Sequence, residues 1–360
     1  MRFDFSDWTA LQPGSDASTY LAATPETVLW GRLPCAADRA VLTVAPGTVV
    51  TVDTVSHEGV LPEQGQDPAA YFARHGVPRE LVLDDAVAVA ARMRHDPADG
   101  PHVVTGPIGV EGARPGDLLR IDVVDLEPRV PYGVISNRHG RGALPGEYPA
   151  TPETVSVFAA VQDDGDGAFG LLPRSADSDA VVRFPLAPFL GIIGVAVAGD
   201  ERAHSVPPGA HGGNLDIRLL VPGTTLFLPV QAPDALVYVG DPHFAQGDGE
   251  VALTAMEAPL RATLRLGVLP EDEAVAEFGR VTGPLILTPD HLVPTGLSED
   301  LDEAVQHCVR AAIELLHARF GMDRPNALAY LSAATDFDIS QVVDLVKGVH
   351  ARIRLADFDA

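Results

Sequence analysis

Short apolar or alternating segments follow one another along the first two thirds of the chain. The clearest of them are 40–55, 116–128, 153–162 and 224–231. They are rich in β-branched residues and bounded by turn residues, which predicts β-strands. Pro-Gly pairs, such as Pro222-Gly223, precede several of them. Because Pro fixes φ and Gly accepts a positive φ, these pairs predict tight turns into the strands.

A helical pattern appears late and in a pair. In 298–321 the apolar residues recur every 3.6 residues or so, which predicts a helix with one buried face. Ser298 is the expected N-terminal cap, and Gly321 is the expected residue just past the end. A second helix is predicted at roughly 324–335, before a returning strand in "DISQVVDLVKGVHARI".

The order of these elements indicates the fold class. Apart from one short helix predicted to start at Asp67-Pro68, strands follow one another without helical spacers. This favours antiparallel sheets packed face to face over a parallel α/β sheet. We therefore predict a mainly β sandwich, with a β-sandwich catalytic region over 1–290 and a helical hairpin with a returning strand over 291–360.

Charge and composition exclude several classes of function. The 360 residues include 50 acidic and 25 basic ones, giving a net charge of −25 that disfavours nucleic acid and anionic membranes as partners. Apolar runs stay below the ~18 to 20 residues of a membrane span, and "MRFDFSDWTALQPGS" lacks the features of a secretory signal. We therefore expect a cytoplasmic protein. Lys347 is the only lysine, which disfavours lysine-dependent amidase and nitrilase chemistry.

The stretch "VGDPHFAQGDGE" (239–250) gathers polar side chains at the edge of a strand that is otherwise apolar. Asp241 and His243 are two residues apart, as are Asp248 and Glu250. In extended backbone such pairs project to the same side. Their oxygen and nitrogen donors suit a divalent cation such as Zn²⁺. The alternative is a glycine-rich surface turn.

A second polar stretch, "HSVPPGAHGGNLDIR" (204–218), places His211 beside the unhindered amides of Gly212 and Gly213. Such amides can hold an anion or a developing oxyanion. Asp216 can bind or orient a ligand. The alternative is a loop in which Asn214 and Asp216 close turns.

A third set of polar residues is scattered at strand ends. It comprises Asp53, with His57 and Glu58 nearby, and His102 and Glu111. Taken singly, each is read as a surface group.

Together these segments resemble the acetamidase/formamidase family. The resemblance rests on "HVVTGPIGVEGARPGDLLRIDVVDLEP", "FLGIIGVAVAG", "PPGAHGGNLDIRLLVPGTTLFLPV", "ALVYVGDPHFAQGDGEVALTAMEAPL" and "ISQVVDLVKGVHARI". It covers most of 41–266 and then 327–353. The most specific part is H-G-G-N-x-D followed by G-D-x-H-x-x-x-G-D-G-E.

The resemblance implies a jelly-roll-like sandwich that forms homo-oligomers and hydrolyses small neutral amides to a carboxylate and ammonia. Related members open lactams. Members are associated with zinc, and some bind calcium. The family's acidic and histidine positions fall on Asp53, Glu111, His211, Asp216, Asp241, His243 and Glu250.

Metal-assisted amide hydrolysis needs a cation, a carboxylate that relays a proton, and donors for the oxyanion. The predicted metal ligands are Asp53, His102, Asp241 and His243. Glu250 is the predicted relay, with Glu111 as its rival, and His211 with the amides of Gly212 and Gly213 is expected to receive the oxyanion. Asn214, Asp216 and Asp248 are assigned to substrate binding, and a second metal at Asp216 and Asp248 stays open.

Two segments depart from the family pattern. Residues 57–100 read as an insertion, and Arg138, His139 and Arg141 are candidates to line the pocket or an oligomer contact. They motivate an alternative function, hydrolysis of a lactam or a larger biosynthetic amide. A third alternative is a non-catalytic β-sandwich binding module that keeps its metal for structure.

Overall fold

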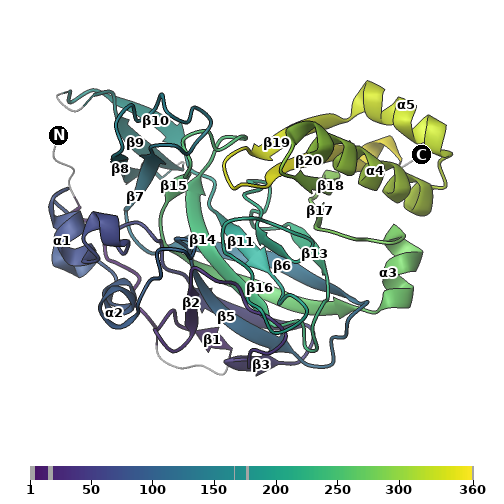
Figure 1. Cartoon of the computed structure of the whole chain (residues 1–360), viewed down its shortest axis with the longest axis horizontal. Coiled ribbons are helices and arrows are strands. Elements are labelled where there is room, and N and C mark those ends of the chain that lie inside the picture. Colours follow the sequence, from purple (N-terminus) through teal and green to yellow (C-terminus); the bar gives the residue numbers. More distant parts are fainter. Residues whose placement is uncertain (1–4, 15–18, 166, 176–177, 359–360) are drawn as a thin grey trace.

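Two β-sheets form the body of the molecule (Figure 1). The computed structural model describes residues 5–14, 19–165, 167–175 and 178–358. The first sheet has nine strands, in the order β1 (Tyr20–Leu21), β4 (Thr48–Asp53), β16 (Leu260–Leu269), β6 (Leu118–Pro128), β13 (Thr225–Pro229), β17 (Leu285–Leu287), β18 (His291–Ser298), β20 (Lys347–Arg354) and β19 (Asp336–Gln341). Most of its strand pairs are antiparallel.

The second sheet has eleven strands. Its main path is β10 (Val181–Pro185), β9 (Ala168–Pro173), β8 (Thr154–Asp163), β7 (Tyr132–Arg138), β15 (Met256–Glu257), β14 (Val237–Ala245), β11 (Phe189–Gly194) and β12 (Gly212–Asn214). A side branch joins it through β5 (Val103–Val110), which pairs with β14, with β2 (Val28–Trp30) and with β3 (Leu42–Val44).

The main hydrophobic core lies between the two sheets. Ile121 of β6 and Leu264 of β16 come from the first sheet, and Ile193 of β11 and Val239 of β14 come from the second. Strand β6 alternates buried and more exposed positions, whereas β14 and β11 are buried along nearly their whole length. A polar side chain on β14 therefore stands inside the protein, where it needs a specific partner.

In the described part of the chain, five α-helices flank the sheets. They are α1 (Pro68–Ala73), α2 (Asp84–Arg92), α3 (Glu271–Phe278), α4 (Leu301–Phe320) and α5 (Arg324–Ala334), with short 3₁₀ turns at Pro62–Gln64, Arg79–Leu81 and Leu355–Asp357. Tyr71 and Phe72 of α1 and Val89 of α2 share a second core with Tyr132 of β7 and Phe158 of β8. The helices of the described segments are each too short or too polar to cross a membrane.

The predicted mainly β, antiparallel architecture with its C-terminal helical pair is confirmed. Helix α4 ends at Gly321, which adopts φ +66°, as the sequence predicts. Its cap is Asp300 and not Ser298, because the Asp300 carboxylate accepts the Glu303 backbone N–H. The helical pair lies beside β18 and β20 at one end of the molecule (Figure 1), so the C-terminal segment extends the first sheet.

The segment 40–55, read as one β region, divides at the turn 45–47 into β3 and β4, which belong to different sheets. After β4 the chain turns into the loop that carries His57 and then into α1 and α2, before β5 returns beside β14. This path brings the loop after β4 and the start of β5 to the same part of β14.

Candidate metal and catalytic site

A cavity of about 450 Å³ lies beside β14 and is lined mainly by polar side chains. Its walls come from the loop after β4, the residues before β5, β14 itself, and the loops that follow β12, β14 and β19. Segments far apart in the chain therefore meet at one place.

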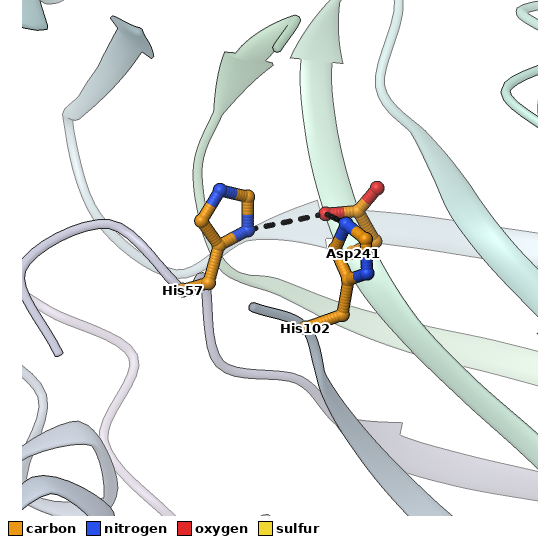
Figure 2. A group of neighbouring side chains, drawn as sticks. All are labelled: His57, His102 and Asp241. Carbon is orange, nitrogen blue, oxygen red and sulfur yellow. Dashed lines mark ion pairs between the residues drawn. The ribbon is translucent and has the colours of Figure 1, made fainter. Parts of the chain in front are cut away.

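Two histidines and an aspartate form the first group in this cavity (Figure 2). His57 Nδ1 lies 3.3 Å from Asp241 Oδ1, and His102 Nε2 lies 3.8 Å from the same oxygen. The two imidazole rings meet edge to face, with centroids 5.4 Å apart. His102 Nδ1 contacts the Ser205 hydroxyl at 3.0 Å, which leaves Nε2 facing Asp241. One donor atom from each residue lies within 4.8 Å of the others, close enough to hold one metal ion.

A second group shares Asp241 with the first. His243 Nε2 lies 3.1 Å from Asp241 Oδ2 and 3.0 Å from Glu257 Oε1, and Glu257 Oε2 lies 3.8 Å from His57 Nδ1. Asp241 has φ +46°, so β14 departs from an extended backbone at this residue, where the side chains of Asp241 and His243 converge. An aspartate in this left-handed region is uncommon, and such strain is concentrated at functional sites.

Carboxylates dominate a third group on the other side of His243. His243 Nδ1 lies 3.9 Å from Asp216 Oδ1, and Glu250 completes a set of three potential ligands. Asp216 and Glu250 both have positive φ, +48° and +46°. Asp344, from the loop between β19 and β20, also lines the cavity, and burial together with the nearby Asp216 carboxylate raises its pKa. The C-terminal segment therefore completes the site.

The pKa values of these groups reflect burial together with the charges around each group. Burial lowers the pKa of His102 to about 4, which keeps its imidazole neutral and able to bind a metal. Burial, together with the charge of Asp241, raises the pKa of Glu257 to about 7. Burial and the nearby Asp216 carboxylate raise the pKa of Glu250 well above its usual range. A bound cation would relieve this crowding of negative charge.

Many polar atoms of the site are buried and lack a hydrogen-bond partner among the described residues. They include both ring nitrogens of His57 and His243, Asp241 Oδ1, both oxygens of Asp216, and Oε2 of Glu250 and Glu257. A buried polar atom without a partner is costly and therefore rare. Imidazole and carboxylate donors of this kind fit a divalent transition metal.

Several residues predicted from the sequence meet in this cavity or directly beside it. His102, Asp241, His243, Glu250 and Asp216 belong to the three groups. Asn214 also lines the cavity, and its side-chain oxygen is buried without a hydrogen-bond partner among the described residues.

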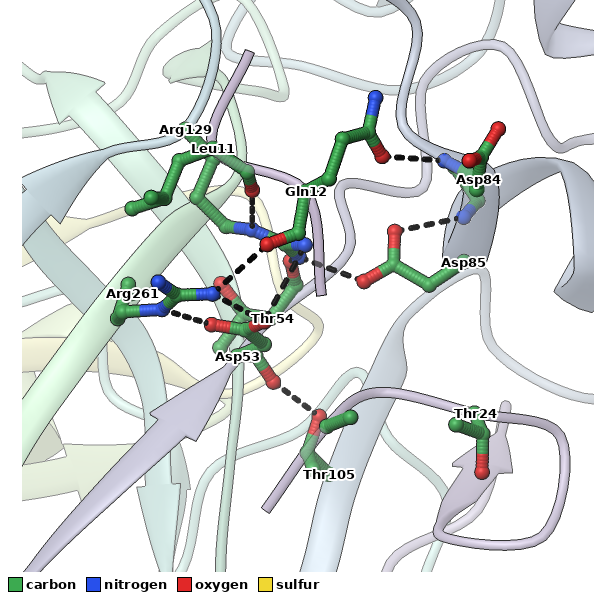
Figure 3. A network of polar contacts seen from close by, with 12 residues as sticks. Leu11, Gln12, Thr24, Asp53, Thr54, Asp84, Asp85, Thr105, Arg129 and Arg261 are labelled. Carbon is green, nitrogen blue, oxygen red and sulfur yellow. Dashed lines mark hydrogen bonds and ion pairs between the residues drawn. The ribbon is translucent and has the colours of Figure 1, made fainter. Parts of the chain in front are cut away.

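Asp53, a predicted metal ligand, lies elsewhere (Figure 3). Arg261 donates to both of its oxygens, at 2.6 and 2.9 Å, and Arg129 Nη2 lies 3.3 Å from Oδ2. The carboxylate is fully buried and neutralised by these two arginines. The Asp53 carboxylate is therefore engaged within the fold, and His57, not Asp53, lies beside Asp241 in the first group.

Glu111 and Asp248 are exposed and do not line the cavity. Glu111 stands in a turn after β5, which removes it as a rival to Glu250 for the proton relay. Asp248 lies 3.9 Å from Arg218, whereas Glu250 turns inward through its left-handed backbone. The expectation that both side chains project to the same side therefore fails, because the chain is not extended there.

The predicted oxyanion donors also lie outside the lining of the cavity. The Gly212 amide donates to the Gly209 carbonyl at 3.0 Å, so it is already used within the loop. The His211 ring packs against Gly209 and Gly213. His211, Gly212 and Gly213 do not line the cavity. Burial lowers the pKa of His211 to about 4. After His211, Asn214 and Asp216 line the cavity, whereas His204 and Val206 line it from the beginning of the same loop.

Sequence spacing gives little indication that His57, Glu257 and Asp344 belong to the site. His57 stands near a predicted strand end, a position that favours a surface group. Glu257 is the sole charged residue in "VALTAMEAPL", and a lone charge in an apolar run is a signal of a buried functional group. Asp344 is likewise the lone charged residue of "SQVVDLV", but the signal is weaker there.

Known amide hydrolases are similar to this chain in sequence. The Acetamidase/Formamidase family profile matches residues 88–200 and 195–356, more than half of the chain. A formamidase of Methylophilus methylotrophus is 29% identical over 304 residues, covering 68% of this chain and 74% of that protein. An acetamidase of Mycolicibacterium smegmatis is 31% identical over 199 residues, covering 42% of this chain and 49% of that protein.

The crystal structure of an acetamidase from Bacillus halodurans has a similar fold. It superposes with a TM-score of 0.72 at 26% identity, covering 94% of this chain and 98% of that one. The relatives named as amide hydrolases and the family match agree with each other. The chain therefore belongs to the Acetamidase/Formamidase family and is an amidase that acts on carbon–nitrogen bonds other than peptide bonds.

Proposed function

We propose that this enzyme hydrolyses a linear amide to a carboxylate and ammonia with the help of a divalent metal. The observation that carries the proposal is the group formed by His57, His102 and Asp241, whose donor atoms converge in the cavity and in part lack hydrogen-bond partners among the described residues. The names of the related proteins support an amide substrate.

His57, His102 and Asp241 would hold the metal, with His243 and Glu257 beside them. Two imidazoles and one carboxylate are a ligand set typical of catalytic zinc. When bound, such an ion lowers the pKa of water towards about 7 and polarises a carbonyl group. Calcium prefers oxygen ligands, so the group of Asp216, Glu250 and Asp344 is the better match for that ion.

Glu250 would move the proton. It lines the cavity, and its Oε2 atom is buried without a hydrogen-bond partner in the described residues. In this role it accepts a proton from the attacking water and delivers it to the departing nitrogen, so that the amide and water become a carboxylate and ammonia. Asn214, whose side chain faces the same cavity, is suited to orient the amide group.

Metal content tests the proposal. We expect protein purified without added metal to retain a stoichiometric divalent ion and to lose ammonia release on chelation. Asp241→Asn should lose the metal, because it removes a charge from the first group. Asp248→Asn, at an exposed position outside the cavity, is the matched control and should keep it. Elemental analysis with ammonia assays on an amide panel gives the result. Metal-free wild-type protein that is active and insensitive to chelators would contradict the proposal.

Gly191 gives a second test, since it lies directly against the site. A Cβ atom there would lie 2.8 Å from Asp241 Oδ2 and from His243 Cε1, and closer still to Asp216 Oδ1. Gly191→Ala should therefore displace the donors and weaken metal binding or activity by about 10- to 100-fold or more. Gly267→Ala on β16, where a Cβ atom meets nothing closer than 3.7 Å, is the control. Metal titration of the apo-protein measures the effect, and wild-type affinity in Gly191→Ala would argue against this site.

The homo-oligomer implied by the family resemblance stays a prediction. Analytical ultracentrifugation of the purified chain tests it directly.

A further inference from the structure

We propose that Arg141 binds an anionic group of the substrate, so that the preferred substrate is an amide carrying a carboxylate at its other end. This inference rests on the proposed amide hydrolysis in the same cavity. Arg138 and Arg141 line that cavity together with Asp241 and Glu250. The cavity therefore has an acidic, metal-binding part and a basic part.

The two arginines differ in their partners. Arg138 is largely buried and pairs with Glu58 at 3.3 Å and with Glu63 at 3.1 Å. Arg141 is exposed at the cavity wall, and no acidic side chain of the described residues pairs with it. Arg138 is already neutralised within the fold, whereas the Arg141 guanidinium is available to a ligand.

Two acidic groups of the cavity wall outside the three ligand groups are also engaged. Glu63 pairs with Arg138, and Asp99 pairs with Arg32 at 2.5 Å. His204, which also lines the cavity, has a lowered pKa because of burial and of the nearby charge of Arg32, with a smaller contribution from Arg141. A substrate carboxylate beside Arg141 would therefore lie near acidic side chains that are already paired and near a neutral imidazole.

The loop that carries Arg141 is tied to the loop of Glu250. The Ala143 backbone N–H donates to the Val251 carbonyl at 2.9 Å, and the Asn137 side chain donates to the Ala252 carbonyl at 2.5 Å. The Arg141 N–H donates to the Arg138 carbonyl at 3.0 Å. These bonds fix the backbone that carries the guanidinium relative to the catalytic part of the cavity.

Size and charge favour a substrate that reaches both parts. The cavity measures about 450 Å³. Pockets of roughly 300–1,000 Å³ enclose drug-sized ligands, so formamide or acetamide would leave most of this one unfilled. With a net charge of −25 the protein as a whole repels anions, so an anionic substrate needs a local cation. A guanidinium supplies two parallel hydrogen bonds to a carboxylate.

The test compares two substrates of the same chain length, succinamate, which carries a carboxylate, and butyramide, which does not. Wild-type enzyme should show a higher kcat/KM for succinamate. In Arg141→Gln the ratio of the two kcat/KM values should fall by about 10- to 150-fold, the usual worth of a charge-assisted hydrogen bond, mainly through KM. Arg265→Gln, at an exposed site on β16, makes the same change in net charge and should leave the ratio at its wild-type value.

The outcomes separate this inference from the proposed function. Equal use of both substrates by wild-type enzyme, or an unchanged ratio in Arg141→Gln, would overturn the role of Arg141 while leaving amide hydrolysis in place. If the ratio of the two kcat/KM values falls equally in Arg141→Gln and Arg265→Gln, the effect comes from net charge alone. That result would also overturn the role of Arg141. Failure of wild-type enzyme to release ammonia from any amide would instead overturn the proposed function.

Discussion

Replacing Glu250 with Gln is expected to lower the rate of hydrolysis of a simple amide by about 10²–10⁴, the usual contribution of general acid–base catalysis. Glu250 is buried and lines the cavity, with Oε2 free of hydrogen bonds to the described residues. Gln keeps the size and shape of the side chain but cannot carry the proton. Steady-state kinetics, with elemental analysis and circular dichroism of the same samples, measures the effect.

Asp248→Asn is the matched control for this prediction. Asp248 is two residues away in the same loop, but it is exposed and outside the cavity, so its replacement should leave the rate close to that of the wild type. A rate for Glu250→Gln that also equals the wild-type rate, with metal retained, would remove Glu250 from the reaction.

Loss of metal together with activity would have a different meaning. It would make Glu250 a ligand, as its place beside Asp216 and His243 allows. The relay would then pass to Glu257, which is buried in the same cavity and has a pKa raised to about 7, chiefly by burial. Glu111 cannot take this role, because it is exposed in a turn outside the cavity.

The second large effect is expected on stability. Arg129→Leu should lower the free energy of unfolding by about 3–5 kcal/mol, because it leaves two buried carboxylates without their shared partner. The Arg129 side chain is fully buried, 2.7 Å from Asp85 and 3.3 Å from Asp53 (Figure 3). It also donates to the carbonyls of Thr54 and Leu11. It therefore joins β4, α2 and the N-terminal segment.

Arg120→Leu provides the comparison for that prediction. Arg120 pairs with Asp122 at 2.9 Å, but its side chain is 51% exposed, so its loss should cost only about 0–1 kcal/mol. Urea denaturation followed by circular dichroism gives both values. If the two variants lose equal stability, the buried network around Arg129 does not hold these segments together.

The fold could be read largely from periodicity. Alternation in "GDLLRIDVVDLEP" predicts β6, and 3.6-residue spacing with Gly321 at its end predicts α4. The pairing of strands could not be read in this way. The turn 45–47 sends β3 and β4 into different sheets, a choice made by contacts with β5 and with β16.

Sequence spacing likewise indicates only some of the residues of the candidate site. Asp241, His243 and Glu250 are close in sequence, so local spacing was enough to group them. The reason that spacing gave was incomplete, because Asp241 and Glu250 converge through left-handed backbone and not through an extended strand. Asp248, which the same spacing groups with them, is exposed and lies outside the cavity.

For polar residues outside this stretch, tertiary contacts decide which of them lie in the candidate site. Asp53 and His57 are four residues apart, and both looked like polar groups at a strand end. Folding places Asp53 against Arg129 and Arg261 and places His57 against Asp241. Spacing along one chain fixes which side chains are neighbours on a strand or helix. The partner that neutralises a buried charge comes from another segment, and it decides whether that charge supports the fold or remains free to hold a metal.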